Sequence, residues 1–216
     1  SEMCIRDRIW ISENSRGFRW TDRRFSDIVV FRNCGRGGSS DKRRPSGRKG
    51  LFDLTMNTVH IRNIALGEGI PKICVPIVAR SREAILEEAT RIRTLCADLV
   101  EWRADWFEDV FTPGKMEEVL ADLRNVLGDM PLLFTFRTRA EGGVREADTA
   151  AYGQLTERAV RSGFADLVDA ELFSGPALVS SLVGLAHARN VKVIISNHDF
   201  KKTPEPDELL RRLSAM

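Results

Sequence analysis

The stretch Val191-Lys-Val-Ile-Ile-Ser-Asn-His-Asp199 decides the fold. Its apolar, β-branched first part is typical of a strand buried in a parallel sheet, where hydrophobic residues run on without alternation. A polar tail, Ser196 to Asp199, follows at the carboxyl end of this strand. Because α/β folds place their chemistry at the carboxyl ends of parallel strands, we expect His198 to belong to a functional site.

Four further apolar runs precede this one, with centres roughly 25 to 34 residues apart, which is the length of one strand–helix unit. The predicted strands are Ile73–Val78, Asp98–Val100, Leu132–Phe136, Asp166–Val168 and Val191–Ile195. Amphipathic segments alternate with them, over Ala84–Leu95, Met116–Leu127, Asp148–Ser162, Ala177–Ala188 and from Pro204 to the last residue. Ser81 stands where the first helix needs a cap. The alternation predicts an α/β fold with a parallel sheet.

Residues 1–57 differ from the rest in charge and composition. They carry 13 Lys+Arg against seven Asp+Glu, whereas residues 58–216 carry 20 against 24. The run Arg36–Gly50 is rich in Gly, Ser and Arg, a composition that buries too little apolar surface to fold. We predict a disordered or non-native basic leader over 1–57 and one domain over 58–216. A leader that binds nucleic acid is the alternative, although no RNP, KH or zinc-finger pattern is present.

The cysteines and the hydropathy pattern favour a cytoplasmic protein. Cys4, Cys34, Cys74 and Cys96 form no CxxC pair, and we expect free thiols, with Cys74 and Cys96 buried. No apolar run is long enough to cross a membrane, and the first residues do not resemble a signal peptide.

Charged residues follow four of the five predicted strands. The second strand ends in Glu101 and Arg103, and the later ones lead into further charged groups at Arg137, Glu141, Asp169, Glu171, His198 and Asp199. The carboxyl ends of parallel strands meet at one edge of a sheet, so we expect these side chains around one pocket.

The residue types indicate the chemistry of such a pocket. Arg103 and Arg137 suit an anionic or polyhydroxylated ligand, because guanidinium groups hold oxygens in fixed geometry. His198 suits proton transfer near neutral pH, and Glu141 is placed to orient it. The pair Gly142-Gly143 predicts a loop that can approach a ligand closely.

Six motifs in order resemble the type I 3-dehydroquinate dehydratases: Pro71-Lys-Ile-Cys-Val75, Glu101-Trp-Arg-Ala-Asp105, Leu132-Leu-Phe-Thr-Phe-Arg137, Glu141-Gly-Gly143, Asp169-Ala-Glu-Leu-Phe173 and Ser196-Asn-His-Asp-Phe200. The resemblance implies a (β/α)₈ TIM barrel, usually homodimeric. It also implies loss of water from 3-dehydroquinate to give 3-dehydroshikimate in the shikimate pathway, through a lysine Schiff base and without metal or cofactor. By the same resemblance His198 is the general acid/base and Glu141 its partner, while Glu101, Arg103 and Arg137 bind substrate.

The sequence departs from the family in its lysines and its length. The family places the Schiff-base lysine at the end of the sixth strand, and none of the seven lysines matches that position. Such a barrel needs roughly 250 residues, and residues 58–216 number 159. We therefore expect a C-terminally truncated, inactive partial barrel of about five βα units. The alternative enzyme is a metal-dependent lyase that uses Glu171, His198 and Asp199 as ligands.

Overall fold

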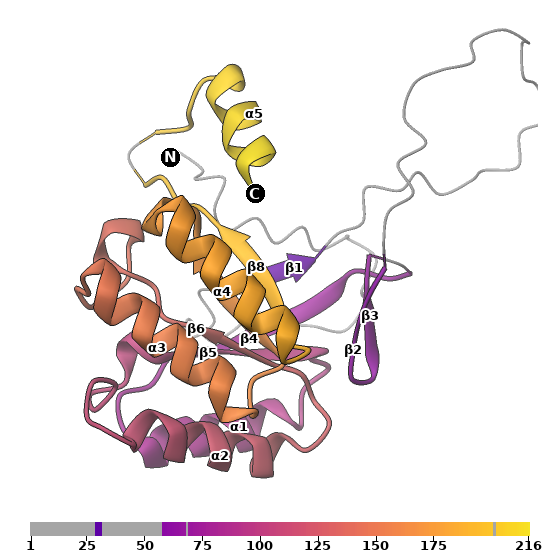
Figure 1. Ribbon diagram of the computed structural model, residues 1–216. Coiled ribbons are helices and arrows are strands. Elements are labelled where there is room, and N and C mark those ends of the chain that lie inside the picture. The colour runs from indigo at the N-terminus through magenta and orange to yellow at the C-terminus, as the bar shows by residue number, and fades with distance from the viewer. Residues whose placement is uncertain (1–28, 32–57, 68, 201) are drawn as a thin grey trace, which may run out of the picture.

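The computed structural model describes residues 29–31, 58–67, 69–200 and 202–216 (Figure 1). Its main sheet has six strands in the order β1-β4-β5-β6-β7-β8, and the pairs from β4 to β8 are all parallel. All five predicted strands are confirmed, with ends that move by at most three residues. The parallel strands are β4 (Lys72–Ile77), β5 (Leu99–Arg103), β6 (Leu132–Thr135), β7 (Leu167–Glu171) and β8 (Lys192–Ser196).

The predicted helices are present as well. Ser81 caps α1, since its Oγ accepts a hydrogen bond from the backbone N–H of Ala84. Asp148 caps α3 in the same way through Ala151. The helices are α1 (Arg82–Ile92), α2 (Lys115–Leu127), α3 (Thr149–Ser162), α4 (Pro176–Ala188) and α5 (Pro206–Ala215).

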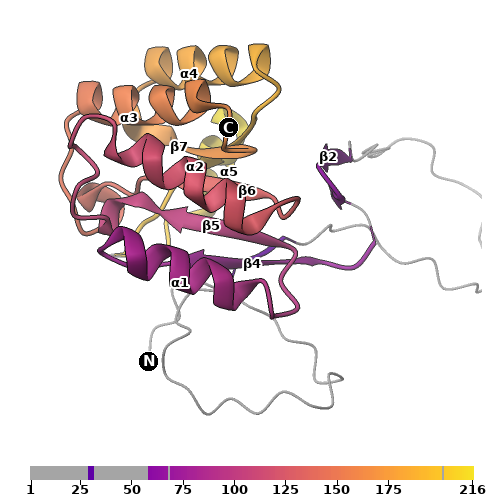
Figure 2. The same cartoon turned by 90° about the horizontal axis from the view of Figure 1, so that it is seen from below.

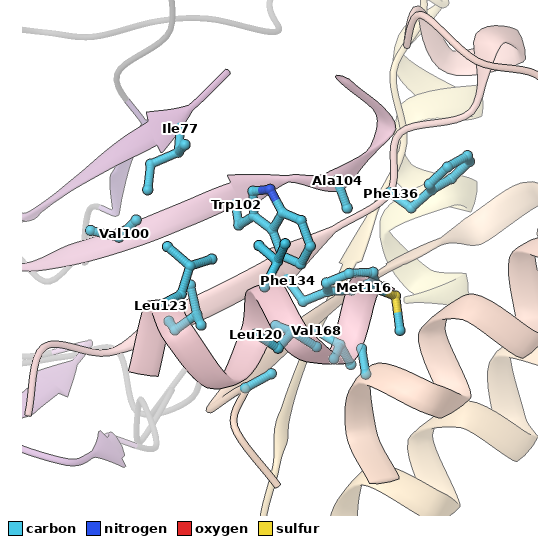
Figure 3. Close-up of a cluster of buried hydrophobic side chains, with 14 of the residues drawn as sticks. Ile77, Val100, Trp102, Ala104, Met116, Leu120, Leu123, Phe134, Phe136 and Val168 are labelled. Carbon is cyan, nitrogen blue, oxygen red and sulfur yellow. The ribbon is translucent and has the colours of Figure 1, made fainter. Parts of the chain in front are cut away.

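Helices α1 to α4 cover one face of the curved parallel sheet, as the two views of Figures 1 and 2 show. Side chains alternate between the two faces of a strand, so every second residue points to the helices. Trp102 of β5 and Phe134 of β6 do so, and their rings meet edge to face at 5.7 Å in the core drawn in Figure 3. The intervening residues point to the opposite face, which we call the inner face.

An antiparallel hairpin, β2 (Val59–Ile61) and β3 (Ile64–Leu66), covers the amino-terminal end of the inner face. Ile61 is buried there in a second apolar cluster, against strand residues that include Leu133 and Leu167. Arg62, at the hairpin turn, donates to the carboxylate of Asp166, which directly precedes β7. This hairpin was not predicted from the sequence.

The predicted leader lies outside the described residues except for β1 (Val29–Phe31), which pairs antiparallel with β4. The boundary at residue 57 and the binding of nucleic acid by the leader therefore stay predictions. Among the described residues, no helix is long and apolar enough to span a membrane.

The expectation for the thiols is confirmed at one position and wrong at another. Cys74 is a buried free thiol, and burial raises its pKa. Cys96 is also free but exposed. The helical pattern that placed it in the core ends earlier than predicted, because α1 stops at Ile92 and Cys96 falls in the connection to β5.

Candidate active site at the carboxyl ends of the strands

The inner face changes from apolar to charged along each strand. Leu99, Leu133 and Leu167 lie in the apolar cluster under the hairpin. Two and four residues further along the same strands, the same face carries polar and charged side chains. These are Glu101 and Arg103 on β5, Thr135 and Arg137 on and after β6, and Asp169 and Glu171 on β7.

Arg137 joins three strands at this end. Its Nη1 donates to Glu171 Oε1 at 3.0 Å and to Ser196 Oγ at 2.9 Å, and its Nη2 donates to Asp169 Oδ2 at 3.0 Å. Ser196 in turn donates to the second oxygen of Asp169 at 2.8 Å. Arg137, Asp169 and Glu171 are each no more than 5% exposed, so these charges depend on one another for compensation.

The electrostatics keep this guanidinium charged. Burial lowers the pKa of Arg137, but the carboxylates of Asp169 and Glu171 raise it, and the net shift is upward. Burial raises the pKa of Glu171, against the hydrogen bonds that its carboxylate accepts from Thr138.

Asp105, which is fully buried, organises the neighbouring part of the site. Its carboxylate accepts two hydrogen bonds from the Arg103 guanidinium, from Nε at 2.8 Å and from Nη2 at 2.9 Å. It also accepts from the backbone N–H groups of Arg137 and Val144. This fork fixes Arg103 and leaves its Nη1 for another acceptor. Burial lowers the pKa of Arg103, but Asp105 raises it, with a net upward shift.

Glu101 lies half-buried between these groups. Burial raises its pKa, whereas the positive charges of Arg103 and Arg137 act in the opposite direction. The structure therefore brings Glu101, Arg103 and Arg137 together, as the sequence predicted.

The loop 138–147 carries Glu141 and is held close to β6. An added Cβ at Gly143 would lie 1.8 Å from the backbone oxygen of Arg137, so only glycine fits without a rearrangement. Thr138 donates to Glu171 through its backbone N–H and its hydroxyl, at 2.9 and 2.7 Å. Gly143 thus lets the loop pack closely against the backbone that follows β6, whereas its predicted approach to a ligand stays a prediction.

Glu141 and His198 form a hydrogen-bonded pair. Glu141 Oε2 lies 2.8 Å from His198 Nδ1 and also accepts from the backbone N–H of His198 at 3.1 Å. An ionised carboxylate can only accept, so this contact assigns the ring proton to Nδ1 and leaves Nε2 as the basic nitrogen. Arg137 Nη1 lies 3.5 Å from the same Glu141 oxygen and connects the pair to the buried network.

The final helix also reaches this pair. Arg212 of α5 donates to Asn197 Oδ1 at 2.7 Å, and Asn197 Nδ2 donates to Glu141 Oε1 at 3.3 Å. The Arg212 guanidinium lies over the ring of Phe173, 5.2 Å from its centroid.

Several residues of the site were not assigned a role from the sequence. Asp169 and Glu171 were noted as strand-end charges, Glu171 also as a ligand of the alternative metal site, but their shared partner Arg137 depends on three-dimensional packing. Asp105 was noted within a motif but was given no role. Tyr152 of α3 had no signal: its hydroxyl donates to the backbone oxygen of Asp169 and accepts from the N–H of Glu171. Burial raises the pKa of this phenol.

The structure does not assemble the alternative metal site. In the parts of the chain that are described, no group of three His, Cys, Asp or Glu side chains is placed to hold a metal ion. Glu171 is committed to Arg137 and Thr138, His198 to Glu141, and Asp199 lies 3.7 Å from Arg212. The helix and hairpin histidines, His187 and His60, are exposed.

Comparison with known proteins gives a consistent result. A family model described as type I 3-dehydroquinase matches residues 73–216. A 3-dehydroquinate dehydratase from Bacillus licheniformis is 50% identical over 155 residues, which cover 72% of this chain and 61% of the relative. One from Clostridioides difficile is 45% identical over 158 residues, covering 73% and 62%. The chain thus spans about three fifths of the length of the curated relatives it matches.

Solved structures agree. A type I 3-dehydroquinate dehydratase from Clostridium difficile, with covalently modified comenic acid, superposes with a TM-score of 0.71 at 44% identity, covering 73% of this chain and 62% of that one. The Enterococcus faecalis 3-dehydroquinate dehydratase gives 0.71 at 42% identity, with 73% and 66% covered. These similarities confirm the predicted partial α/β barrel.

Proposed function

Since the chain belongs to the type I 3-dehydroquinase family, we propose that its strand-end cluster is part of an active site that dehydrates 3-dehydroquinate to 3-dehydroshikimate. In this reaction the substrate loses a proton from C2 and the hydroxyl group from the neighbouring carbon, which leave together as water. An imine between a lysine and the substrate ketone acidifies that C–H by withdrawing electrons, so a base of ordinary strength suffices.

The Glu141–His198 contact of 2.8 Å carries the proposal. Glu141 holds the Nδ1 proton and orients the ring, so that Nε2 takes the C2 proton. The resulting imidazolium is stabilised by the same carboxylate. It then returns its proton to the departing hydroxyl, which leaves as water.

The arginines and Glu101 suit the substrate's oxygens. Arg103 is fixed by Asp105 through Nε and Nη2, and its Nη1 is available to a hydroxyl or carboxylate oxygen. Glu101 accepts hydrogen bonds from substrate hydroxyls. Arg137, held by Asp169 and Glu171, supplies a fixed positive charge behind the ring.

We place the imine-forming lysine outside these 216 residues. Lys72 and Lys192 begin β4 and β8, at the end opposite His198, and Lys115 begins α2. Lys202 is exposed in the connection to α5. The remaining lysines, Lys42, Lys49 and Lys201, lie outside the described residues.

Borohydride reduction tests this placement. The chain treated with 3-dehydroquinate and borohydride should keep its mass, because none of the lysines that the structure describes lies beside His198 at the carboxyl ends of the strands. A version lengthened to match its relatives should gain the reduced adduct. An adduct mapped to Lys201 or Lys202 of the present chain would contradict the placement.

The lengthened version also tests the base. His198→Ala should still form the reducible imine but lose turnover by about 10³-fold, the size expected when a general base is removed. His187→Ala, on the exposed end of α4, is the matched control and should retain full turnover. Retained turnover in His198→Ala would overturn the assignment.

We further propose that the whole protein acts as a cytoplasmic homodimer. The family resemblance supports the dimer, and the free thiols Cys74 and Cys96 suit a reducing compartment. Sedimentation of the lengthened version tests the dimer. No metal or cofactor enters the proposed steps.

A further inference from the structure

A second cleft, with a volume of about 390 Å³, opens beside the candidate active site. It lies between the connections that follow β4, β5 and β6, and none of its lining residues has a role in the proposed reaction. Loop 138–147 contributes to it through Arg139 and Arg145. The volume falls within the range of roughly 300 to 1,000 Å³ that is usual for small-molecule sites.

Three guanidinium groups line this cleft, from Arg80, Arg139 and Arg145. Arg145 is fixed: its Nε donates to the backbone oxygen of Asp105 at 3.1 Å and its Nη2 to that of Glu108 at 3.2 Å. These bonds use two of the five N–H groups that a guanidinium carries. The cleft therefore presents a cation whose position does not depend on the ligand.

The opposing carboxylates neutralise the cleft incompletely. Glu108 lies 3.9 Å from Arg80, and Glu146 lies 3.6 Å from Arg139. The two carboxylate side chains are 61% and 80% exposed. Such exposed pairs stabilise little and can exchange partners with a bound anion. With three cations against two anions, the cleft favours negative charge.

The remaining wall is aromatic. Trp106 and Phe111 line the cleft, and Phe111 is 44% exposed although its ring packs against Phe136 at 5.7 Å. Trp106 is partly buried. Accessible aromatic rings beside guanidinium groups suit a ligand with a flat apolar part next to a negative charge.

We propose that this cleft is a binding site for a small organic anion that carries a flat ring, such as an aromatic carboxylate. The carboxylate binds the guanidinium groups, with Arg145 as the fixed donor, and the ring packs on Trp106 and Phe111. The site uses only residues of this chain and needs neither the imine nor the His198 base, so it goes beyond the proposed function.

Tryptophan fluorescence tests the proposal, with sodium benzoate as the probe and ionic strength held constant with sodium chloride. Benzoate should give a saturable change with a Kd on the order of 1 mM, given its few heavy atoms. Inorganic phosphate supplies charge without a ring, and benzamide supplies a ring without charge. Each should bind at least about tenfold more weakly, since each lacks one of the two contacts.

Variants locate the site. Arg145→Gln should weaken benzoate binding by about tenfold, as expected for a lost hydrogen bond to a charged group. Arg80→Gln, whose side chain is 69% exposed, should weaken it in the same direction without disturbing the loop. Trp106→Phe should remove most of the fluorescence change. Arg158→Gln, which replaces an arginine paired with Glu117 away from the cleft, is the matched control.

Circular dichroism shows whether each variant is folded. If Arg145→Gln is unfolded, the benzoate affinity of Arg80→Gln tests the proposal instead. An unchanged affinity for benzoate in the folded arginine variants would overturn the proposal. A fluorescence change that survives in Trp106→Phe would also overturn it, and so would benzoate binding that is no tighter than benzamide binding. The result is independent of dehydratase activity, so failure here leaves the proposed reaction untouched.

Discussion

At the amino-terminal end of the parallel strands, the inner face is apolar and a hairpin covers it, with Leu133 and Leu167 buried. At the carboxyl end, the same face carries Arg137 among Asp169 and Glu171, buried to a similar degree. The two ends are about four residues apart on each strand. The first gains stability from burying apolar surface, whereas the second depends on every charge having its partner. The same strands thus carry a stabilising apolar cluster at one end and a charged cluster at the other.

The largest effect should come from breaking the charged end. Arg137→Ala leaves the buried carboxylates without their shared cation and should lower the free energy of unfolding by about 4 kcal/mol. Urea unfolding measures it. Arg158→Ala, which breaks the partly exposed pair with Glu117, should cost at most about 1 kcal/mol. Equal losses in the two variants would contradict the role of Arg137.

Leu167→Ala should break the apolar end, with a loss of about 3 kcal/mol from the buried methyl groups and the cavity left behind. Because no charge is involved, the loss should be the same at pH 5 and pH 8. The loss in Arg137→Ala should shrink as the pH falls, since burial raises the pKa of Glu171 and this carboxylate can then take up a proton. Leu210→Ala, on an exposed position of α5, is the control. A strongly pH-dependent loss in Leu167→Ala would contradict the separation of the two ends.

Gly143→Ala tests the loop that connects the charged end to Glu141. The added methyl group would overlap the backbone oxygen of Arg137, so the loop must move, at a cost of about 2 kcal/mol. Gly184→Ala on α4 meets nothing within 4 Å and should stabilise the helix by roughly 0.5–1 kcal/mol. Thermal unfolding should therefore show a lower midpoint temperature for Gly143→Ala and a higher one for Gly184→Ala than for the parent.

The smallest effect should be a gain. Burial raises the pKa of Glu101 above its unfolded value, so the ionised form costs stability above the folded pKa. Glu101→Gln should then be more stable than the parent at pH 7. The advantage should vanish as the pH falls below the unfolded pKa, because Glu101 is then protonated in both states. A stability gain of Glu101→Gln that grows as the pH falls would contradict a raised pKa for Glu101.

Much of this architecture could be predicted from the sequence. Continuous apolar runs such as Val191–Ile195 specify buried parallel strands, and caps such as Ser81 specify where helices begin. Since parallel strands deliver their carboxyl ends to one edge, the sequence also predicted that Glu101, Arg137 and His198 come together.

The rest depended on contacts between distant segments. The hairpin β2–β3 is short, and its residues are held by the strand ends that they cover and by Asp166. The choice of Asp169 and Glu171 as partners of Arg137 follows from packing, since several carboxylates follow the strands. Tyr152 lies on a helix face that looked only apolar, and Cys96 was misplaced because a helix ended one turn early.

Helix α5 buries none of its residues, yet Arg212 bonds to Asn197 and Asn197 to Glu141. A substitution of Arg212 would therefore change the setting of the Glu141 carboxylate, two side chains away, and through it that of the His198 imidazole. The geometry of the Glu141–His198 pair thus depends on a side chain of α5, at a position that no survey of the pocket itself would single out.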